Sequence, residues 1–504
     1  MGVIAKQSIK GTIVTYLGVA VGFVTTFFVI TRFLSAEDIG LARVMIDAAT
    51  LFIGLAQLGT SASILRFYPY FAEPSEVRGQ KPEEHGFFFW TIVVPMVGFL
   101  LVALQFMVCY APLSEWFGEK SPLFVNYYYL VLPLAFFMLY QTVFETNANV
   151  RMRIVFPRAV RELLTRVGLL AVYLLYAFDV VTTDGFVWSL VGVYAVAALC
   201  NTVYLFSLGG VSLKPDFAYL KQNPGIVRKY LLYTAFLVLS AVVSVLAPTL
   251  SSFFITAQMG LSYTGIFAIA TYMAMMVSIP YRSLTAIAAP QLSLAIKHDD
   301  REQISHQLTQ VSGNLLLIGG LILALMWVNI DLIFAILPNG ATYAVARRTV
   351  LLLGIGQLCV ATFQFTVTAL SYSRYYPFTL LFSLVLTVLA LLLNNLFIPR
   401  WGIDGAALAT LTAQVSYYLI ALITIRLALG SRIFTRRHLL TILLLVLLFA
   451  ANALCLRYLP VGTIWLSSLL RTLLVVAVAA LAYQWRISPE INEYIHALFH
   501  RIRL

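Results

Sequence analysis

Long apolar stretches alternate with short polar connections along the whole chain. Each stretch holds about 20 residues, the length of a helix that crosses the hydrocarbon core of a membrane. We therefore expect an all-α polytopic membrane protein with about fourteen transmembrane helices. The predicted spans are residues 11–34, 38–65, 86–110, 122–145, 155–178, 185–209, 228–255, 262–287, 308–336, 342–370, 376–398, 403–427, 436–458 and 462–486.

The connections are short, and none leaves room for an extramembrane domain with a soluble catalytic site. This favours a transporter or a channel over an enzyme. The apolar run that follows MGVIAKQSIK is too long for the core of a signal peptide and is expected to be the first spanning helix. Residues 487–504 place apolar side chains at helical spacing, which predicts an amphipathic tail on the cytoplasmic leaflet. A frayed, solvated tail is the alternative.

Two predicted helices begin with similar short sequence motifs, which indicates an internal repeat. Residues 34–40 read LSAEDIG and residues 261–265 read LSYTG, and a proline follows each, at Pro69 and Pro290. Both helices run in the same direction, so the repeat predicts two six-helix bundles related by a pseudo-two-fold axis along the membrane normal. The alternative is chance similarity between apolar segments. The predicted parts are bundles at 1–210 and 211–430, two appended helices at 431–486, and the tail at 487–504.

Composition supports the membrane class. Hydrophobic residues make up 61% of the 504 residues and charged residues 11%, whereas a soluble domain has about 25% charged residues. A soluble enzyme, a disordered chain and a disulfide-rich secreted module are therefore excluded. The four cysteines are isolated in apolar runs, and the six histidines, including His438, fall in the predicted connections or the tail. We expect no metal site, and without a Walker A motif we expect no cofactor.

The net charge of +12 has a topological explanation. With the N-terminus in the cytoplasm, 24 of the 33 lysines and arginines fall on the cytoplasmic side and 7 on the other side. This distribution follows the positive-inside rule, so we expect both termini in the cytoplasm and no binding of nucleic acid.

Three segments carry a resemblance to a known family. They are TRFLSAEDIGLARVMIDAATLFIGLAQLGTSASILRFYP at residues 31–69, AIAAPQLSLA at 286–295, and NNLFIPRWGIDGAALATLTAQ at 394–414. The chain resembles the polysaccharide flippases of the multidrug/oligosaccharidyl-lipid/polysaccharide (MOP) exporter superfamily. Many relatives carry an acidic residue in the seventh helix, but residues 246–258 have none, which puts a cation-coupling site there in doubt.

The resemblance implies translocation of a polyprenyl-diphosphate-linked oligosaccharide across a bacterial inner membrane. The glycan would serve cell-surface polysaccharide such as the O-antigen of lipopolysaccharide. The expected mechanism is alternating access through a cationic central cavity, and a polysaccharide polymerase and glycosyltransferases are possible partners. The alternatives are a multidrug or cation-coupled exporter of the same superfamily and a flippase for a peptidoglycan precursor or a teichoic-type polymer.

The third of these segments also has a structural interpretation. Pro399 and Gly402 predict a tight turn between two helices. Gly405, Ala406 and their small neighbours give the second helix a face that permits close helix packing.

Ionisable residues inside the predicted spans are the candidate substrate contacts, because such residues usually face protein or a water-filled cavity. Most are cationic, and arginine matches phosphate through its planar fork of donors. The candidates are Arg43, Asp47, Glu145, Arg161, Arg166, Arg282 and Arg347.

Several of these residues have a second interpretation. Arg43 and Asp47 are four residues apart, so they share a helix face and can neutralise each other. Arg161 and Arg166 can be anchors at the cytoplasmic mouth, and Arg347 can reach the membrane interface by snorkelling.

Overall fold

The fold was analysed in a computed structural model of the chain, in which residues 14–15, 17–71, 84–209, 211–431, 433–458, 463–485, 488–490 and 492–493 are described. All regular elements in these residues are helices, which confirms the predicted all-α class. Ten helical stretches are long and apolar enough to cross a membrane, so the chain is a multi-pass membrane protein. The count of fourteen spans stays a prediction. The predicted tail at 487–504 lies almost entirely outside the described residues.

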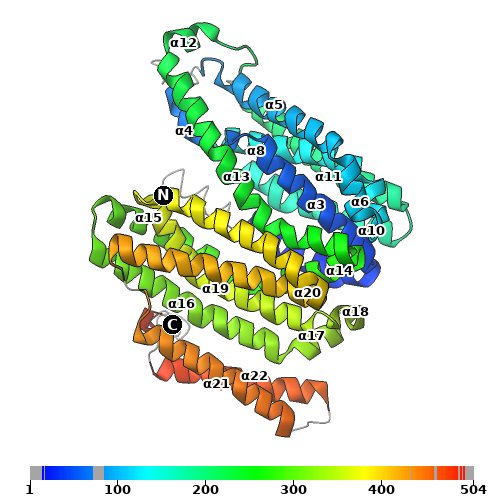
Figure 1. The fold of residues 1–504 in the computed structure, drawn as a ribbon, viewed down its shortest axis with the longest axis vertical. Coiled ribbons are helices and arrows are strands. Elements are labelled where there is room, and N and C mark those ends of the chain that lie inside the picture. Colours follow the sequence, from blue (N-terminus) through cyan, green and yellow to red (C-terminus); the bar gives the residue numbers. More distant parts are fainter. Residues whose placement is uncertain are drawn as a thin grey trace, which may run out of the picture. The chain divides into compact units, whose positions relative to one another are not determined.

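The chain divides into two compact units, residues 1–265 and 266–504. The predicted boundary between two six-helix bundles at residue 210 stays a prediction. The helices of the first unit, drawn from blue to green in Figure 1, are η1 (Thr25–Ile30), α2 (Thr31–Phe33), α3 (Ala36–Ala56), α4 (Thr60–Phe71), α5 (Phe87–Val108), α6 (Tyr110–Gly118), α7 (Pro122–Asn126), η2 (Tyr128–Leu130), α8 (Val131–Val150), α9 (Val155–Ala159), η3 (Val160–Leu164), α10 (Thr165–Ala177), α11 (Thr183–Leu208), α12 (Phe217–Gln222) and α13 (Pro224–Met259).

Helix α8 lies at the centre of the first unit. It packs against α3, α4, α5 and α11, and its core positions Leu134, Leu139 and Val143 are inaccessible to solvent. Ser35 caps the start of α3: its Oγ accepts from the backbone N–H of Asp38, and the Asp38 carboxylate accepts from the Ser35 N–H. This reciprocal capping box fixes where α3 begins.

The glycines of the two repeated sequence segments meet at a close approach. A Cβ atom on Gly40 of α3 would collide with the carbonyl oxygen of Leu261, and one on Gly265 would collide with the carbonyl oxygen of Ala36. Each glycine therefore admits the backbone carbonyl that precedes the other glycine by four residues. This reciprocity supports the repeat, while the two-fold axis of the whole chain stays a prediction.

The second unit begins within α14, whose first residues belong to the first unit. Its helices are α14 (Leu261–Met275), η4 (Met276–Ser278), α15 (Ile279–Lys297), α16 (Arg301–Val328), α17 (Ile330–Ile336), α18 (Gly340–Ala344), α19 (Arg347–Tyr372), α20 (Tyr376–Leu429), α21 (Arg436–Tyr458) and α22 (Ile464–Gln484). Helix α19 packs against α16 and α20, and the core between these helices includes Leu315, Phe365 and Tyr418.

The continuous ribbon of α20 consists of two helices that meet at Gly402. The φ angle of Gly402 is 57° and its ψ angle is −135°, a conformation that glycine adopts without a steric penalty. A Cβ on Gly405 would collide with the carbonyl oxygen of Phe397, and Ala406 is fully buried. The predicted turn and the predicted close packing after it are both confirmed.

Helices α21 and α22 pack on α16. The prediction that His438 lies in a polar connection is wrong, because its side chain is fully buried in the first turn of α21. Its Nε2 is hydrogen-bonded to Ser312 Oγ of α16 at 2.9 Å and its Nδ1 to Thr435 Oγ1 at 3.0 Å. Between α16 and α22, the side chains of Asn329 and Thr472 exchange two hydrogen bonds.

Candidate functional site

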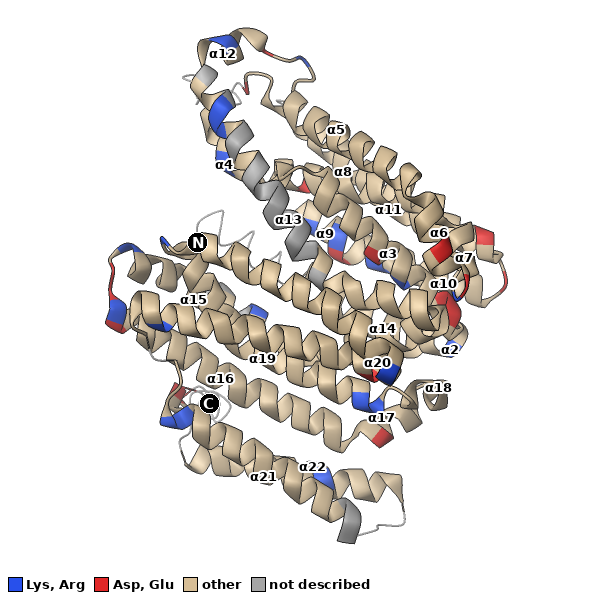
Figure 2. Cartoon of the chain, in the orientation of Figure 1, with Lys and Arg blue, Asp and Glu red and all other residues tan. Residues whose placement is uncertain are grey.

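Charged residues are sparse along the helices, as Figure 2 shows, so those inside the first unit stand out. Arg43 and Asp47 form an ion pair on one face of α3, with Arg43 Nε 2.8 Å from Asp47 Oδ2. Asp47 is buried. The contact is the mutual neutralisation that the four-residue spacing indicates.

A second group of charges lies where α8, α9, η3 and α10 meet. We call it the arginine cluster, and it consists of Glu145, Arg158, Arg161, Glu162 and Arg166. Arg161 Nη1 is 2.9 Å from Glu145 Oε1, and Arg161 Nε is 3.4 Å from Glu162 Oε1. Glu162 Oε2 also accepts from Arg166 Nη2 at 3.0 Å. Three arginines face two glutamates, so the cluster carries a net positive charge.

The π-helical turn η3 positions Arg161 and Glu162 within this cluster. In its wider winding the Val160 carbonyl accepts from the backbone N–H of Thr165, five residues on, and Thr165 Oγ1 donates to the same carbonyl at 3.1 Å. Such turns are frequent at functional sites. The widened turn places the two side chains beside Glu145 of α8.

Exposure distinguishes the roles of the two candidate arginines. The Arg161 side chain is 49% exposed although it contacts Glu145, which is only 9% exposed. Arg166 instead donates from Nη1 to the Gly18 carbonyl oxygen at 2.7 Å, and Gly22 leaves room for its guanidinium. Arg166 therefore ties α10 to the helical residues 17–24 that precede η1, while Arg161 presents a free face beside its carboxylate partners.

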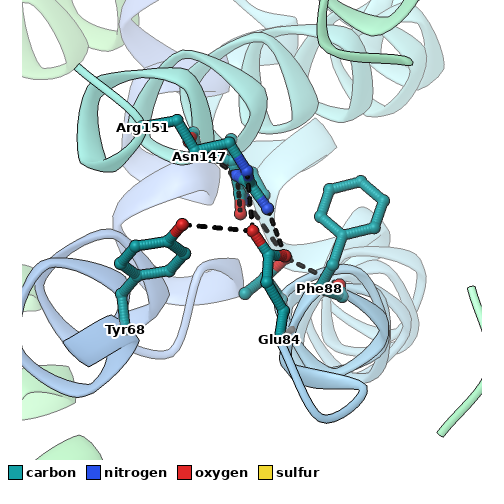
Figure 3. A network of polar contacts seen from close by, with 7 residues as sticks. Tyr68, Glu84, Phe88, Asn147 and Arg151 are labelled. Atoms are coloured by element: carbon teal, nitrogen blue, oxygen red, sulfur yellow. Dashed lines mark hydrogen bonds and ion pairs between the residues drawn. The ribbon is translucent and has the colours of Figure 1, made fainter. Parts of the chain in front are cut away.

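A further network, which sequence reasoning missed, ties Glu84 to Arg151 (Figure 3). Arg151 donates from Nε to Glu84 Oε1 at 2.9 Å and from Nη2 to Glu84 Oε2 at 2.5 Å. Tyr68 Oη donates to Glu84 Oε1 at 3.2 Å, and Arg151 Nη1 donates to the Asn147 carbonyl oxygen at 2.6 Å. The Glu84 side chain is 5% exposed and that of Arg151 is 11% exposed. The sequence offered only the four-residue spacing of Asn147 and Arg151 as a signal.

The connection before α13 docks on the turn that precedes α5. The Asp216 carboxylate accepts from the Tyr219 backbone N–H at 3.0 Å and contacts His85 Nδ1 at 3.3 Å, and the His85 ring stacks on the Tyr219 ring. The Tyr219 N–H, followed by the His85 contact, holds the pKa of Asp216 below its usual value.

The other candidate residues lie in the second unit. Arg282 of α15 is exposed, and the described part of the chain provides it with no ion-pair partner. Arg347 forms two contacts with the Asp331 carboxylate, at 3.0 and 3.2 Å, and lies over the Trp327 ring. Arg471 of α22 is only 4% exposed, and among the described residues its buried Nη1 has no hydrogen-bond partner.

Comparison with known proteins identifies the family. Residues 4–294, more than half of the chain, match the family described as polysaccharide biosynthesis protein. The chain belongs to this family. Membership confirms the family resemblance, and the match includes the segment at 31–69 and nearly all of the segment at 286–295. The segment at 394–414 lies outside it. No curated protein matches the sequence.

Solved structures of the MOP superfamily share the fold of this family member. The lipid II flippase MurJ, in an inward closed conformation, matches with a TM-score of 0.68 and 12% identity over 94% of this chain and 99% of that one. An inward-facing multidrug resistance MATE family transporter matches with a TM-score of 0.63 and 12% identity, over 81% of this chain and 94% of that one. A MOP superfamily transporter from Pyrococcus furiosus matches with a TM-score of 0.57 and 12% identity, over 85% of this chain and 95% of that one.

The site therefore lies in a chain that shares its fold with the MurJ flippase and MATE transporters. The structure brings together Glu145, Arg161 and Arg166, and it pairs Arg43 with Asp47. Of the candidates in the first unit, Arg161 combines a buried carboxylate partner, Glu145, with an exposed face. A role in substrate binding stays a prediction for all seven candidates.

Proposed function

We propose that the protein is a flippase that moves a polyprenyl-diphosphate-linked oligosaccharide from the inner to the outer leaflet of a bacterial plasma membrane. It would act by alternating access in the synthesis of cell-surface polysaccharide, with both termini in the cytoplasm and no cofactor. Family membership and the shared fold support this proposal. The observation that carries it is the half-exposed guanidinium of Arg161 in the arginine cluster.

The chemistry of the substrate explains the need for this arginine. A diphosphate diester carries two negative charges, and a charge inside a membrane needs a partner of opposite sign or a water-filled cavity. A guanidinium presents its donors in a planar fork that matches phosphate oxygens. Arg161 is held from one side by Glu145 and Glu162, so its exposed face is oriented before the substrate arrives.

A second candidate substrate differs only in its head group. The structural match to a lipid II flippase covers nearly the whole of both chains, which favours a peptidoglycan precursor as that alternative. Both substrates share the diphosphate, so the Arg161 argument applies to both. A direct comparison of the two lipids in one assay separates them.

The proposal is tested with the purified chain in proteoliposomes that contain a fluorescent lipid-linked oligosaccharide. A membrane-impermeant quencher reports how fast the label reaches the outer leaflet. We expect the wild type to exceed empty liposomes. Arg161→Ala should slow transfer about tenfold to a hundredfold, because a hydrogen bond to a charged group contributes about 1.5–3 kcal/mol.

Arg301→Ala is the matched control, because Arg301 is an exposed arginine whose nearest carboxylate contact is 3.9 Å away. It should transport at the wild-type rate. Wild-type protein no faster than empty liposomes would refute the proposed function. Equal rates for Arg161→Ala and the wild type would refute the site.

A further inference from the structure

We propose that Thr165 is a positioning residue for Arg161: its hydroxyl stabilises the π turn η3, and the wide winding of that turn places the arginine beside Glu145. The inference rests on the proposed function, because Arg161 is the arginine that would meet the diphosphate. It deepens that function by assigning a role to an uncharged, buried residue that follows the arginine by one turn.

Thr165 closes η3 with two hydrogen bonds to one carbonyl oxygen. Its backbone N–H bonds to the Val160 oxygen, five residues back, and its Oγ1 donates to the same oxygen at 3.1 Å. In an α-helix the N–H would bond to the carbonyl four residues back, which is that of Arg161. A threonine hydroxyl in a helix also bonds to a carbonyl three or four residues back. The step of five residues therefore needs a cause outside this helix.

The neighbouring helix α8 supplies that cause through Gln141. Its Nε2 donates to Thr165 Oγ1 at 3.4 Å, and both side chains are buried. The Gln141 carbonyl oxygen in turn accepts from Nδ2 of Asn201 on α11 at 3.4 Å. The threonine hydroxyl thus accepts from α8 and donates to Val160, so a chain of buried hydrogen bonds joins α11, α8 and the π turn.

The same face of α8 contacts this segment at two successive levels. Gln141 and Glu145 are four residues apart on α8, and so are their partners Thr165 and Arg161. Residues at this spacing lie one above the other on a helix. The first level fixes the winding of the turn, and the second receives the guanidinium, with Arg161 Nη1 2.9 Å from Glu145 Oε1.

A change of winding would move Arg161 away from Glu145. The π turn holds about one residue more than an α turn, and one residue of an α-helix occupies about 100° around the axis. Tightening η3 to α winding would therefore rotate the residues at its start by up to about 100° relative to α10. Arg166 lies after the turn and is bonded to the Gly18 carbonyl oxygen, so it would keep its place. The effect falls on Arg161.

The experiment compares three threonine variants in the proteoliposome assay with the fluorescent lipid-linked oligosaccharide. Thr165→Val removes the hydroxyl and keeps the shape of the side chain, whereas Thr165→Ser keeps the hydroxyl. We expect Thr165→Val to slow transfer about twofold to tenfold, the change that one hydrogen bond within a protein makes to an equilibrium. Thr165→Ser should transport at close to the wild-type rate.

Thr362→Val is the matched control. Thr362 is a buried threonine of α19 whose Oγ1 donates to the Leu358 carbonyl oxygen at 2.8 Å, an ordinary bond over four residues. Its loss of a hydroxyl should leave the transport rate unchanged. A general cost of placing valine in a membrane helix would slow this variant as well, which would overturn the inference.

A double variant separates positioning from general stability. If Thr165 acts through Arg161, Thr165→Val should slow transfer no further in a protein that already carries Arg161→Ala. Independent effects would instead multiply. Gln141→Met removes the donor to Thr165 Oγ1 and should give the same pattern, so it carries the test if Thr165→Val does not fold.

Three results would overturn the inference and leave the proposed function intact. They are a wild-type rate for Thr165→Val, a rate for Thr165→Ser as low as that for Thr165→Val, and effects of Thr165→Val and Arg161→Ala that multiply. A wild type no faster than empty liposomes would instead refute the proposed function.

Discussion

The buried ion pair between Glu84 and Arg151 offers the sharpest test of what stabilises the first unit. Arg151→Met removes both hydrogen bonds to the carboxylate, at 2.9 and 2.5 Å, and leaves Glu84 at 5% exposure without a counter-ion. Breaking a buried pair by removing one partner costs about 3–5 kcal/mol. We expect Arg151→Met to lower the free energy of unfolding by an amount in this range.

A double-mutant cycle isolates the contribution of the pair. Glu84→Gln removes the charge that Arg151→Met strands, so the double variant should be more stable than the sum of the single effects predicts, by about 1–3 kcal/mol. Unfolding is followed by tryptophan fluorescence in mixed micelles as the fraction of a denaturing detergent rises. The same cycle with Tyr68→Phe tests whether the Tyr68 hydroxyl belongs to the network.

The control pair is Glu119 and Lys120, whose side chains are 82% and 50% exposed and 3.6 Å apart. Exposed pairs contribute about 0–1 kcal/mol, so Glu119→Gln and Lys120→Met should have small effects that add. If the costs of Glu84→Gln and Arg151→Met also add, the two side chains do not stabilise the protein as a pair, and the argument from their burial is wrong.

Two further predictions concern the backbone approach at Gly40 and the docking of the connection before α13. Gly40→Ala should lower the melting temperature, because the new Cβ would collide with a backbone oxygen and overpacking costs about 1–3 kcal/mol. The control is Gly192→Ala, since a Cβ at Gly192 would meet open space. This variant should be neutral or more stable by about 1 kcal/mol or less. The pKa of Asp216 is lower in the folded protein than in the unfolded chain. The ionised carboxylate therefore stabilises the folded protein above its unfolded pKa of about 4, and this stabilisation is lost as the pH falls through the folded pKa. Amide exchange of residues 216–222 should therefore accelerate under acid. A melting temperature unchanged by Gly40→Ala, or exchange that follows only the intrinsic acid dependence, would contradict the respective argument.

The parts of the structure that the sequence predicts are those set by local rules. The length of the apolar runs indicates where helices lie. The proline and the glycine at 399 and 402 predict the break in α20, and the four-residue spacing predicts the Arg43–Asp47 pair. The contact of Glu145 with Arg161 depends instead on a π turn, which has no periodic signature in the sequence.

Contacts between distant segments were beyond prediction for a related reason. Glu84 and Arg151 are 67 positions apart, and Ser312 and His438 are 126 apart. Apolar positions around a membrane helix do not reveal which face meets protein and which meets lipid, because both environments are apolar. The partners of polar residues then follow only from tertiary packing.

The buried arginine of α22 has a consequence for how the chain is inserted during synthesis. An arginine near the middle of a helix raises the free energy of insertion through the translocon by about 2.5–3.5 kcal/mol. Arg471 lies seven residues into α22, which contacts α16 and α21, and Thr472 beside it bonds to Asn329. The growing chain would therefore release α22 into lipid most easily when α16 and α21 are already there to receive it. The insertion of α22 thus depends on helices that are made before it.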